Sequence, residues 1–210
     1  MEERIDVVVL ACERTIVSLR DGVEAVLYRT ARRHGEAPMD RGRALRRRLE
    51  ALPATSFAAA YERLAAERGY RWAGPGDLAV AGAAAASTLY PDVAPALEAA
   101  RAAGLRITAV AEADRQLVEA ALRPLDGAFD DVVTGCALAT AIRRIGAPPA
   151  RVLHVAALGA SLRAAGALGI RSAWLNRRAA PPPSDAPHDF EWRSLEGLSA
   201  WLAEPVGTAP

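Results

Sequence analysis

The chain has 210 residues, of which 51% are hydrophobic, so it is long enough to bury a sizeable core. Its 26 Lys and Arg residues nearly balance its 25 Asp and Glu residues, and this balance argues against a nucleic-acid groove or a polybasic membrane patch. Two cysteines are too few for a disulfide framework, and no stretch reaches the roughly 20 apolar residues of a membrane span. We therefore expect a cytoplasmic protein that binds neither nucleic acid nor membranes.

The first predicted element is a strand at residues 5–10 (IDVVVL), a short β-branched run without polar alternation. Such a run is typical of a strand that is covered on both faces of a parallel sheet. Between residues 17 and 90 no comparable strand follows. Apolar side chains there recur at helical spacing, as at Val23, Val26 and Leu27, which predicts a block of helices.

After residue 90 the pattern alternates regularly between helices and strands. Asp92 is a candidate cap for a helix that ends at Gly104, and the proline-rich segment 179–187 reads as a linker. Further strands are predicted at residues 105–110, 131–134, 152–155 and 170–175, and further helices at 113–122, 137–145, 158–168 and 195–202.

This alternation predicts an α/β fold with a Rossmann-like parallel sheet flanked by helices. We expect the core to comprise residues 1–16 and 88–204, and a helical cap, residues 17–87, to be inserted after the first strand. Such an insert would lie above the carboxyl ends of the strands, where ligands bind in sheets of this kind. Residues 205–210 are expected to form a disordered tail.

Three stretches of the sequence carry a resemblance to a known family. They are residues 10–17 (LACERTIV), 90–110 and 152–177, the last ending in Trp174-Leu175-Asn176-Arg177. In these stretches the chain resembles the haloacid dehalogenase superfamily, most closely the 2-haloacid dehalogenases with a helical cap. The resemblance covers nearly the whole chain and implies the same core and cap. It also suggests a homodimer, because 2-haloacid dehalogenases commonly pair through helical surfaces.

The catalytic residues that the resemblance implies are missing from the first two family motifs. The family's nucleophilic Asp, which forms a covalent intermediate, corresponds to Ala11 when the sequences are aligned on Thr15. The motif's glycine corresponds to Arg14, and Glu13 lies where phosphatase members have a second Asp. In the second motif, Ala111 replaces the Ser or Thr that binds substrate, and Glu112 follows it.

The residues of the third and fourth family motifs are also replaced in this sequence. No Lys occurs in residues 134–138, where the family's charge-stabilising Lys is expected, and the nearest cations are Arg143 and Arg144. The carboxylates of the fourth motif correspond to Ala157 and Ser161, so the Mg²⁺ site of phosphatase members is predicted to be lost and no cofactor is expected.

The remaining polar loop residues allow two interpretations. A new site could use Glu13 or Glu112 for acid/base catalysis, with Arg14, Thr15, Asp114 or Arg115 binding the ligand. Ordinary solvated loop charges and ion pairs would produce the same pattern, and we consider them about twice as common. The basic run at residues 41–48 is most simply the solvated face of a cap helix.

Thiols and histidines give no clear catalytic group. Cys12 is expected to be a buried structural thiol, because strand alternation turns it away from the pocket that Ala11 faces. Cys136 lies in a loop and is the better candidate for contact with a ligand, and His154, inside a predicted strand, is expected to be a core histidine.

Two hypotheses about function follow. In the first, the chain is a pseudoenzyme whose core and cap bind a small molecule or a protein partner without converting it. In the second, the cleft has been reused for non-hydrolytic acid/base chemistry on an apolar molecule, because the alanines Ala11, Ala111 and Ala157 make the predicted pocket less polar. A residual hydrolase is a third reading, and coordinated loss at all four motifs argues against it.

Overall fold

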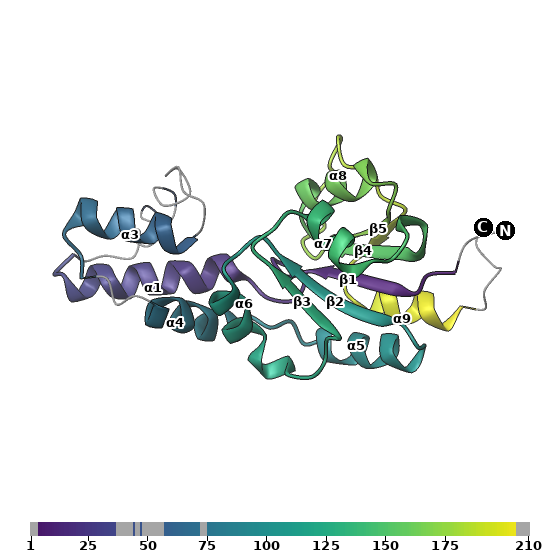
Figure 1. Cartoon of the computed structure of the whole chain (residues 1–210), viewed down its shortest axis with the longest axis horizontal. Helices are drawn as coiled ribbons and strands as arrows, with labels where there is room; N and C mark the ends of the chain where they lie inside the picture. Colours follow the sequence, from purple (N-terminus) through teal and green to yellow (C-terminus); the bar gives the residue numbers. More distant parts are fainter. Residues whose placement is uncertain (1–3, 37–43, 45–46, 48–56, 72–74, 205–210) are drawn as a thin grey trace. The chain divides into compact units, whose positions relative to one another are not determined.

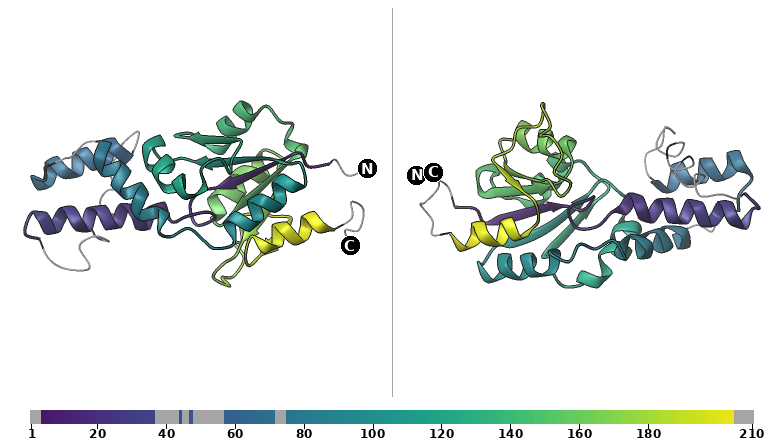
Figure 2. Two further views of the ribbon diagram at one scale, coloured as in Figure 1. Left: turned by 90° about the horizontal axis from the view of Figure 1, so that it is seen from below. Right: turned by 180° about the vertical axis from the view of Figure 1, so that it is seen from behind.

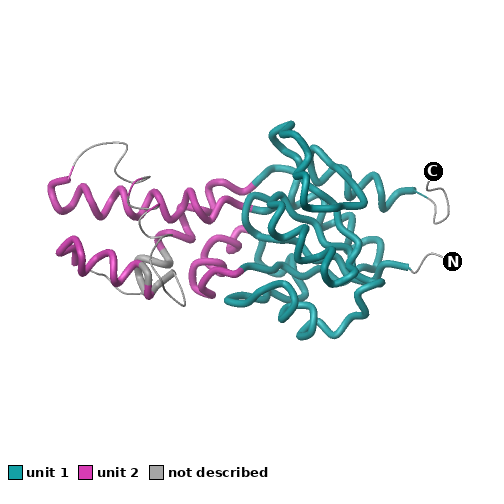
Figure 3. The backbone as a smooth tube through the Cα atoms, turned by 90° about the horizontal axis from the view of Figure 1, so that it is seen from above, with its two compact units in different colours: residues 1–16, 90–111, 125–210 teal, residues 17–89, 112–124 magenta. Residues whose placement is uncertain are grey.

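The computed structural model describes residues 4–36, 44, 47, 57–71 and 75–204 (Figure 1). The chain divides into two compact units (Figure 3). The first unit consists of Met1–Ile16, Tyr90–Ala111 and Leu125–Pro210, and the second of Val17–Leu89 and Glu112–Pro124. The second unit thus contains residues 112–124 in addition to the segment that follows the first strand.

A six-stranded sheet forms the centre of the first unit, with strand order β3-β2-β1-β4-β5-β6 and every pair parallel. This confirms the predicted α/β fold with a parallel sheet. The last strand is absent from the sequence prediction, since it has only three residues and follows the proline-rich segment. The strands are β1 (Val7–Ala11), β2 (Arg106–Ala111), β3 (Asp131–Thr134), β4 (Val152–Ala156), β5 (Arg171–Leu175) and β6 (Phe190–Trp192).

Helices cover both faces of the sheet (Figures 1 and 2). Helices α7 (Leu138–Ile145) and α8 (Gly159–Ala167) pack side by side over one face, and α5 (Val93–Ala102) and α9 (Glu196–Ala203) pack side by side over the other. Two short 3-10 helices, η1 (Arg123–Leu125) and η2 (Pro149–Arg151), precede β3 and β4. With both faces covered, the inner strands are buried, as their continuous apolar runs predict.

The register aligns the carboxyl ends of three neighbouring strands, β1, β4 and β5. Leu10 pairs with Val155 and Ala156 pairs with Trp174, so the tips of β1, β4 and β5 lie side by side. β1 has β2 on one side and β4 on the other, and the connections from β1 and β4 run in opposite directions across the sheet. In open α/β sheets such a switch point, at the carboxyl ends of the strands, is where ligands bind.

The second unit is helical. Its helices are α1 (Leu19–Arg33), α3 (Phe57–Arg68), α4 (Pro75–Ala86) and α6 (Arg115–Leu122). Helix α4 packs against both α1 and α6, and the hydroxyls of Thr30 on α1 and Tyr61 on α3 lie 2.8 Å apart in a buried hydrogen bond. Most of the basic run at residues 41–48 and the whole of the expected tail 205–210 lie outside the described residues.

Close packing around α4 depends on two glycines. A Cβ atom on Gly22 of α1 would overlap the backbone oxygen of Ala81, and a Cβ atom on Gly82 of α4 would lie 2.5 Å from the backbone oxygen of Leu117. The helices therefore approach backbone to backbone at these positions. Within the described part of the chain, no helix has both the length and the apolar character of a transmembrane span.

Candidate functional site

The tips of β1, β4 and β5 form an apolar row. Ala11, at the end of β1, packs against a buried cluster that includes Ala156 of β4 and Trp174 of β5, with Leu162 of α8 and Ala186 completing the cluster. Trp174 is 5% exposed and Leu162 is fully buried. Ala11 itself is partly buried, so the position that the resemblance assigns to the nucleophile carries a methyl group at the edge of an apolar cluster.

The loop after β1 contains a non-glycine residue with a positive φ. Arg14 has φ = 59°, in the left-handed region that glycine adopts most readily, and it occupies the position that the resemblance assigns to glycine. Glu13 and Arg14 form an ion pair with 3.7 Å between carboxylate oxygen and Nε. Thr15 is fully buried, and its hydroxyl accepts a hydrogen bond of 3.1 Å from the backbone N–H of Ala157.

Cys12 is buried, as predicted, and it is a poor nucleophile. Burial away from water, aided by the nearby Glu13 carboxylate, raises the pKa of the Cys12 thiol to about 12. The thiol therefore stays protonated at neutral pH, and a protonated thiol does not attack carbon or phosphorus.

His154 lies on β4, on the same face of the sheet as Ala156, two residues before it. It is fully buried, which confirms the expected core position. Its Nδ1 lies 3.1 Å from the backbone oxygen of Val9, and its Nε2 lies 2.8 Å from the hydroxyl of Ser161 on α8. Desolvation, partly offset by the Val9 hydrogen bond, lowers the pKa of His154 to about 4, so the ring is neutral at pH 7.

A buried ion pair between Arg177 and Asp92 ties the loops of the first unit together. Arg177 follows β5, and its two terminal nitrogens lie 2.7 and 3.0 Å from the two carboxylate oxygens of Asp92. The same guanidinium donates to the backbone oxygen of Thr15 and lies 3.9 Å from the ring centroid of Tyr90. Both members of the pair are mostly buried, at 14% and 10% exposure.

The expectation that Asp92 caps the following helix is wrong. Asp92 precedes α5, but its side chain makes no capping hydrogen bond. Its carboxylate instead binds Arg177 and accepts a hydrogen bond of 2.7 Å from the backbone N–H of Leu195. Arg177, 85 residues away in sequence, binds both carboxylate oxygens of Asp92, and such a two-point pair of opposite charges is stronger than a single cap bond to an uncharged backbone N–H.

The other predicted site residues are spread over several elements. Ala111 ends β2 and Cys136 lies in the loop before α7, and both are half-buried. Arg143 and Arg144, the cations nearest to the position of the missing Lys, are exposed on α7. Glu112, Asp114 and Arg115 belong to the second unit, where Arg115 forms an exposed ion pair with Glu119. Their clustering with Glu13 and Arg14 of the first unit stays a prediction.

The donor set does not fit the Mg²⁺ ion of phosphatase members. Alanines stand at 11 and 157, and the remaining oxygen of the fourth motif, on Ser161, is hydrogen-bonded to His154. Among the residues that the structure describes, no three His, Cys, Asp or Glu side chains are grouped to hold a metal.

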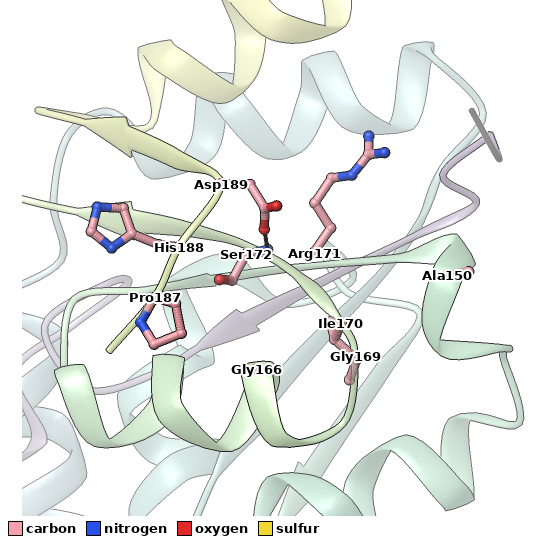
Figure 4. Close-up of a pocket in the computed structure, with 9 residues that line it drawn as sticks. All are labelled: Ala150, Gly166, Gly169, Ile170, Arg171, Ser172, Pro187, His188 and Asp189. Carbon is pink, nitrogen blue, oxygen red and sulfur yellow. Dashed lines mark hydrogen bonds between the residues drawn. The ribbon is translucent and has the colours of Figure 1, made fainter. Parts of the chain in front are cut away.

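An open depression of about 510 Å³ lies elsewhere in the first unit, near the amino end of β5 (Figure 4). Its lining includes Gly166 of α8, Arg171 and Ser172 of β5, and the segment 187–189. The Ser172 backbone N–H donates to Asp189 at 2.7 Å, so part of its polar lining is already satisfied. Parallel α/β sheets bind ligands at the opposite end of their strands.

Sequence reasoning missed three features of this site. It did not foresee the hydrogen bond between His154 and Ser161, the Arg177–Asp92 pair, or the packing of Trp174 at the tip of β5. Only the contact between His154 and Ser161 could have been predicted from sequence spacing, because the two residues are seven positions apart across one strand-to-helix turn.

Comparisons with known proteins agree with the fold. A family model described as haloacid dehalogenase-like hydrolase matches residues 11–156. A haloacid dehalogenase-type phosphatase from Thermococcus onnurineus superimposes with a TM-score of 0.74 at 18% identity, covering 95% of this chain and 98% of that one. A search of curated proteins found no match.

Two further solved structures have the same fold. L-2-haloacid dehalogenase from Xanthobacter autotrophicus, with chloropropionic acid covalently bound, has a TM-score of 0.67 at 20% identity and covers 98% of this chain and 100% of that one. CbbY from Rhodobacter sphaeroides, in complex with phosphate, has a TM-score of 0.66 at 17% identity, covering 92% and 96%. Since the family model spans more than half of the 210 residues, the chain belongs to the haloacid dehalogenase-like hydrolases.

Proposed function

We propose that this chain is a noncatalytic member of its family, which binds a small molecule or a protein partner without converting it. The observation that carries the proposal is the packing of Ala11 against Ala156, Leu162 and Trp174. A covalent mechanism of the kind implied by the resemblance needs an attacking oxygen at this position, and a methyl group has none.

The groups around Ala11 do not replace the missing nucleophile. The Cys12 thiol is buried and protonated, and the Thr15 hydroxyl is fully buried and accepts the Ala157 N–H. The Glu13 carboxylate is 18% exposed and paired with Arg14. Loss of a nucleophile costs on the order of 10⁴ to 10⁶ in turnover, and the other members of a catalytic set rescue little of it.

The experiment is an assay of the purified chain with 2-chloropropionate and with p-nitrophenyl phosphate, each with and without Mg²⁺. We expect no product above the rate without protein. A matched variant, Glu13→Gln, shows whether any turnover needs the single carboxylate that follows Ala11 in the loop.

Two outcomes would contradict the proposal. Turnover that persists in Glu13→Gln and rises with Mg²⁺ would identify a residual hydrolase of the family type. Turnover that Glu13→Gln removes would instead identify hydrolysis that uses the Glu13 carboxylate as an acid or base.

A further inference from the structure

The direction of the hydrogen bonds at His154 is fixed by its neighbours. The backbone oxygen of Val9 accepts only, so Nδ1 of His154, 3.1 Å away, must carry the ring proton. The ring is neutral, so Nε2 then has a lone pair and no hydrogen. The hydroxyl of Ser161, 2.8 Å from Nε2, must donate its proton to His154.

This arrangement leaves Ser161 with acceptor capacity only. A serine hydroxyl has one proton and two lone pairs, and here the proton is used inside the protein. Ser161 is half-buried in the first turn of α8, so part of its side chain is open to solvent or to a small molecule. Its neighbour Leu162 belongs to the apolar cluster around Trp174, which Ala11 packs against.

We propose that Ser161 is a ligand-binding residue, which accepts a hydrogen bond from an uncharged molecule that carries one hydroxyl or N–H donor on an apolar body. This inference rests on the proposed binding function and names the class of ligand. A carboxylate or phosphate is disfavoured there, because at neutral pH it would present its own lone pairs to those of Ser161 and leave an acceptor unpaired.

The tautomer of His154 is the first test, and it needs no ligand. The chain has three histidines, so the ¹⁵N signals of His154 in the labelled protein can be assigned by their loss in His154→Gln. We expect a protonated Nδ1 and an unprotonated Nε2 at pH 7. A protonated Nε2 would reverse the Ser161 hydroxyl and overturn the inference.

Binding is the second test, with benzyl alcohol, benzyl methyl ether and benzoate as probes in ligand-observed NMR. We expect the alcohol to bind about fivefold more tightly than the ether, which is the usual gain from one hydrogen bond, and benzoate to bind more weakly than either. Ser161→Ala should remove the difference between alcohol and ether, and Ser199→Ala on α9 should keep it.

The inference would be overturned if the alcohol did not bind, if the alcohol and the ether bound equally well, or if benzoate bound more tightly than both. It would also be overturned if the preference for the alcohol survived in Ser161→Ala. Because these probes carry no halogen or phosphate, such a failure is separate from a failure of the proposed function. That function is overturned only by turnover or by a covalent adduct.

Discussion

Ala11 lies at the tip of β1 with its methyl group against Ala156 and Trp174. Reintroducing the family's carboxylate as Ala11→Asp should lower the free energy of unfolding by about 1 to 3 kcal/mol, because a charge is placed at a partly buried position against an apolar cluster. Chemical denaturation at pH 7 measures this loss. The uncharged variant Ala11→Asn should lose less. An Ala11→Asp protein as stable as the wild type, or one that gains dehalogenase activity, would show that a polar pocket already exists there.

His154 gives a prediction on pH. Its pKa is about 4 in the folded chain and about 6.5 when unfolded, so the unfolded state binds the proton more readily. The stabilisation from keeping His154 neutral is therefore complete above pH 6.5 and is lost as the pH falls toward 4, by up to about 3 kcal/mol.

The measurement is the free energy of unfolding at pH 7 and pH 5. His154→Gln cannot titrate, so the change between these two pH values should be smaller in the variant than in the wild type. If the free energy of unfolding depended on pH equally in both proteins, groups other than His154 would be responsible and the prediction would be contradicted.

At the scale of elements, α4 depends on glycine where it meets α1 and α6. Gly22→Ala and Gly82→Ala should each destabilise the chain by about 1 to 3 kcal/mol, because a methyl group would meet backbone atoms of Ala81 or Leu117. Thermal or chemical unfolding checks this. Gly166→Ala in α8 is the matched control, since its Cβ would meet only Pro187 at 3.4 Å, and this variant should be neutral or slightly stabilised.

The pair of Arg177 and Asp92 joins four loops and helix ends of the first unit. Arg177→Met should cost about 3 kcal/mol, because it leaves the Asp92 carboxylate mostly buried without its cation. In a double-mutant cycle, Arg177→Met with Asp92→Asn should cost less than the sum of the single variants. Additive costs would mean that the two side chains contribute separately.

The sequence predicted most of the helices and strands but few of the contacts between them. The strand predicted at residues 131–134 coincides with β3, and that predicted at 152–155 is extended by one residue in β4, because buried apolar runs are a local signal. β6 was missed since its three residues carry little periodicity. The Asp92 side chain was assigned to a local cap, and only the tertiary fold brings Arg177 to it.

The candidate site was predictable only in part for the same reason. Aligning the family motifs located Ala11, Thr15, Ala157 and Ser161, and the structure joins Thr15 to Ala157 through a hydrogen bond. The proton arrangement at Ser161 was not predictable, because it depends on the Val9 carbonyl, 145 residues from His154 along the chain. Such long-range contacts leave no spacing pattern in a sequence.

Across the whole molecule, the chain has a parallel sheet and a helical second unit, while the catalytic positions named by the resemblance carry other residues. The homodimer implied by the resemblance remains a proposal, which analytical ultracentrifugation of the purified chain would test. A fold retained in this way suits a binding role, since the scaffold positions loops whether or not a reaction follows.

Intact-mass spectrometry of the full chain, quenched with acid during incubation with excess 2-chloropropionate, shows whether a covalent intermediate forms on this protein. The relative from Xanthobacter autotrophicus is known with chloropropionic acid covalently bound, which makes it the positive control. For this chain we predict an unchanged mass. A mass increase that maps to any residue from Ala11 to Thr15 would show that a nucleophile has survived and would contradict the account.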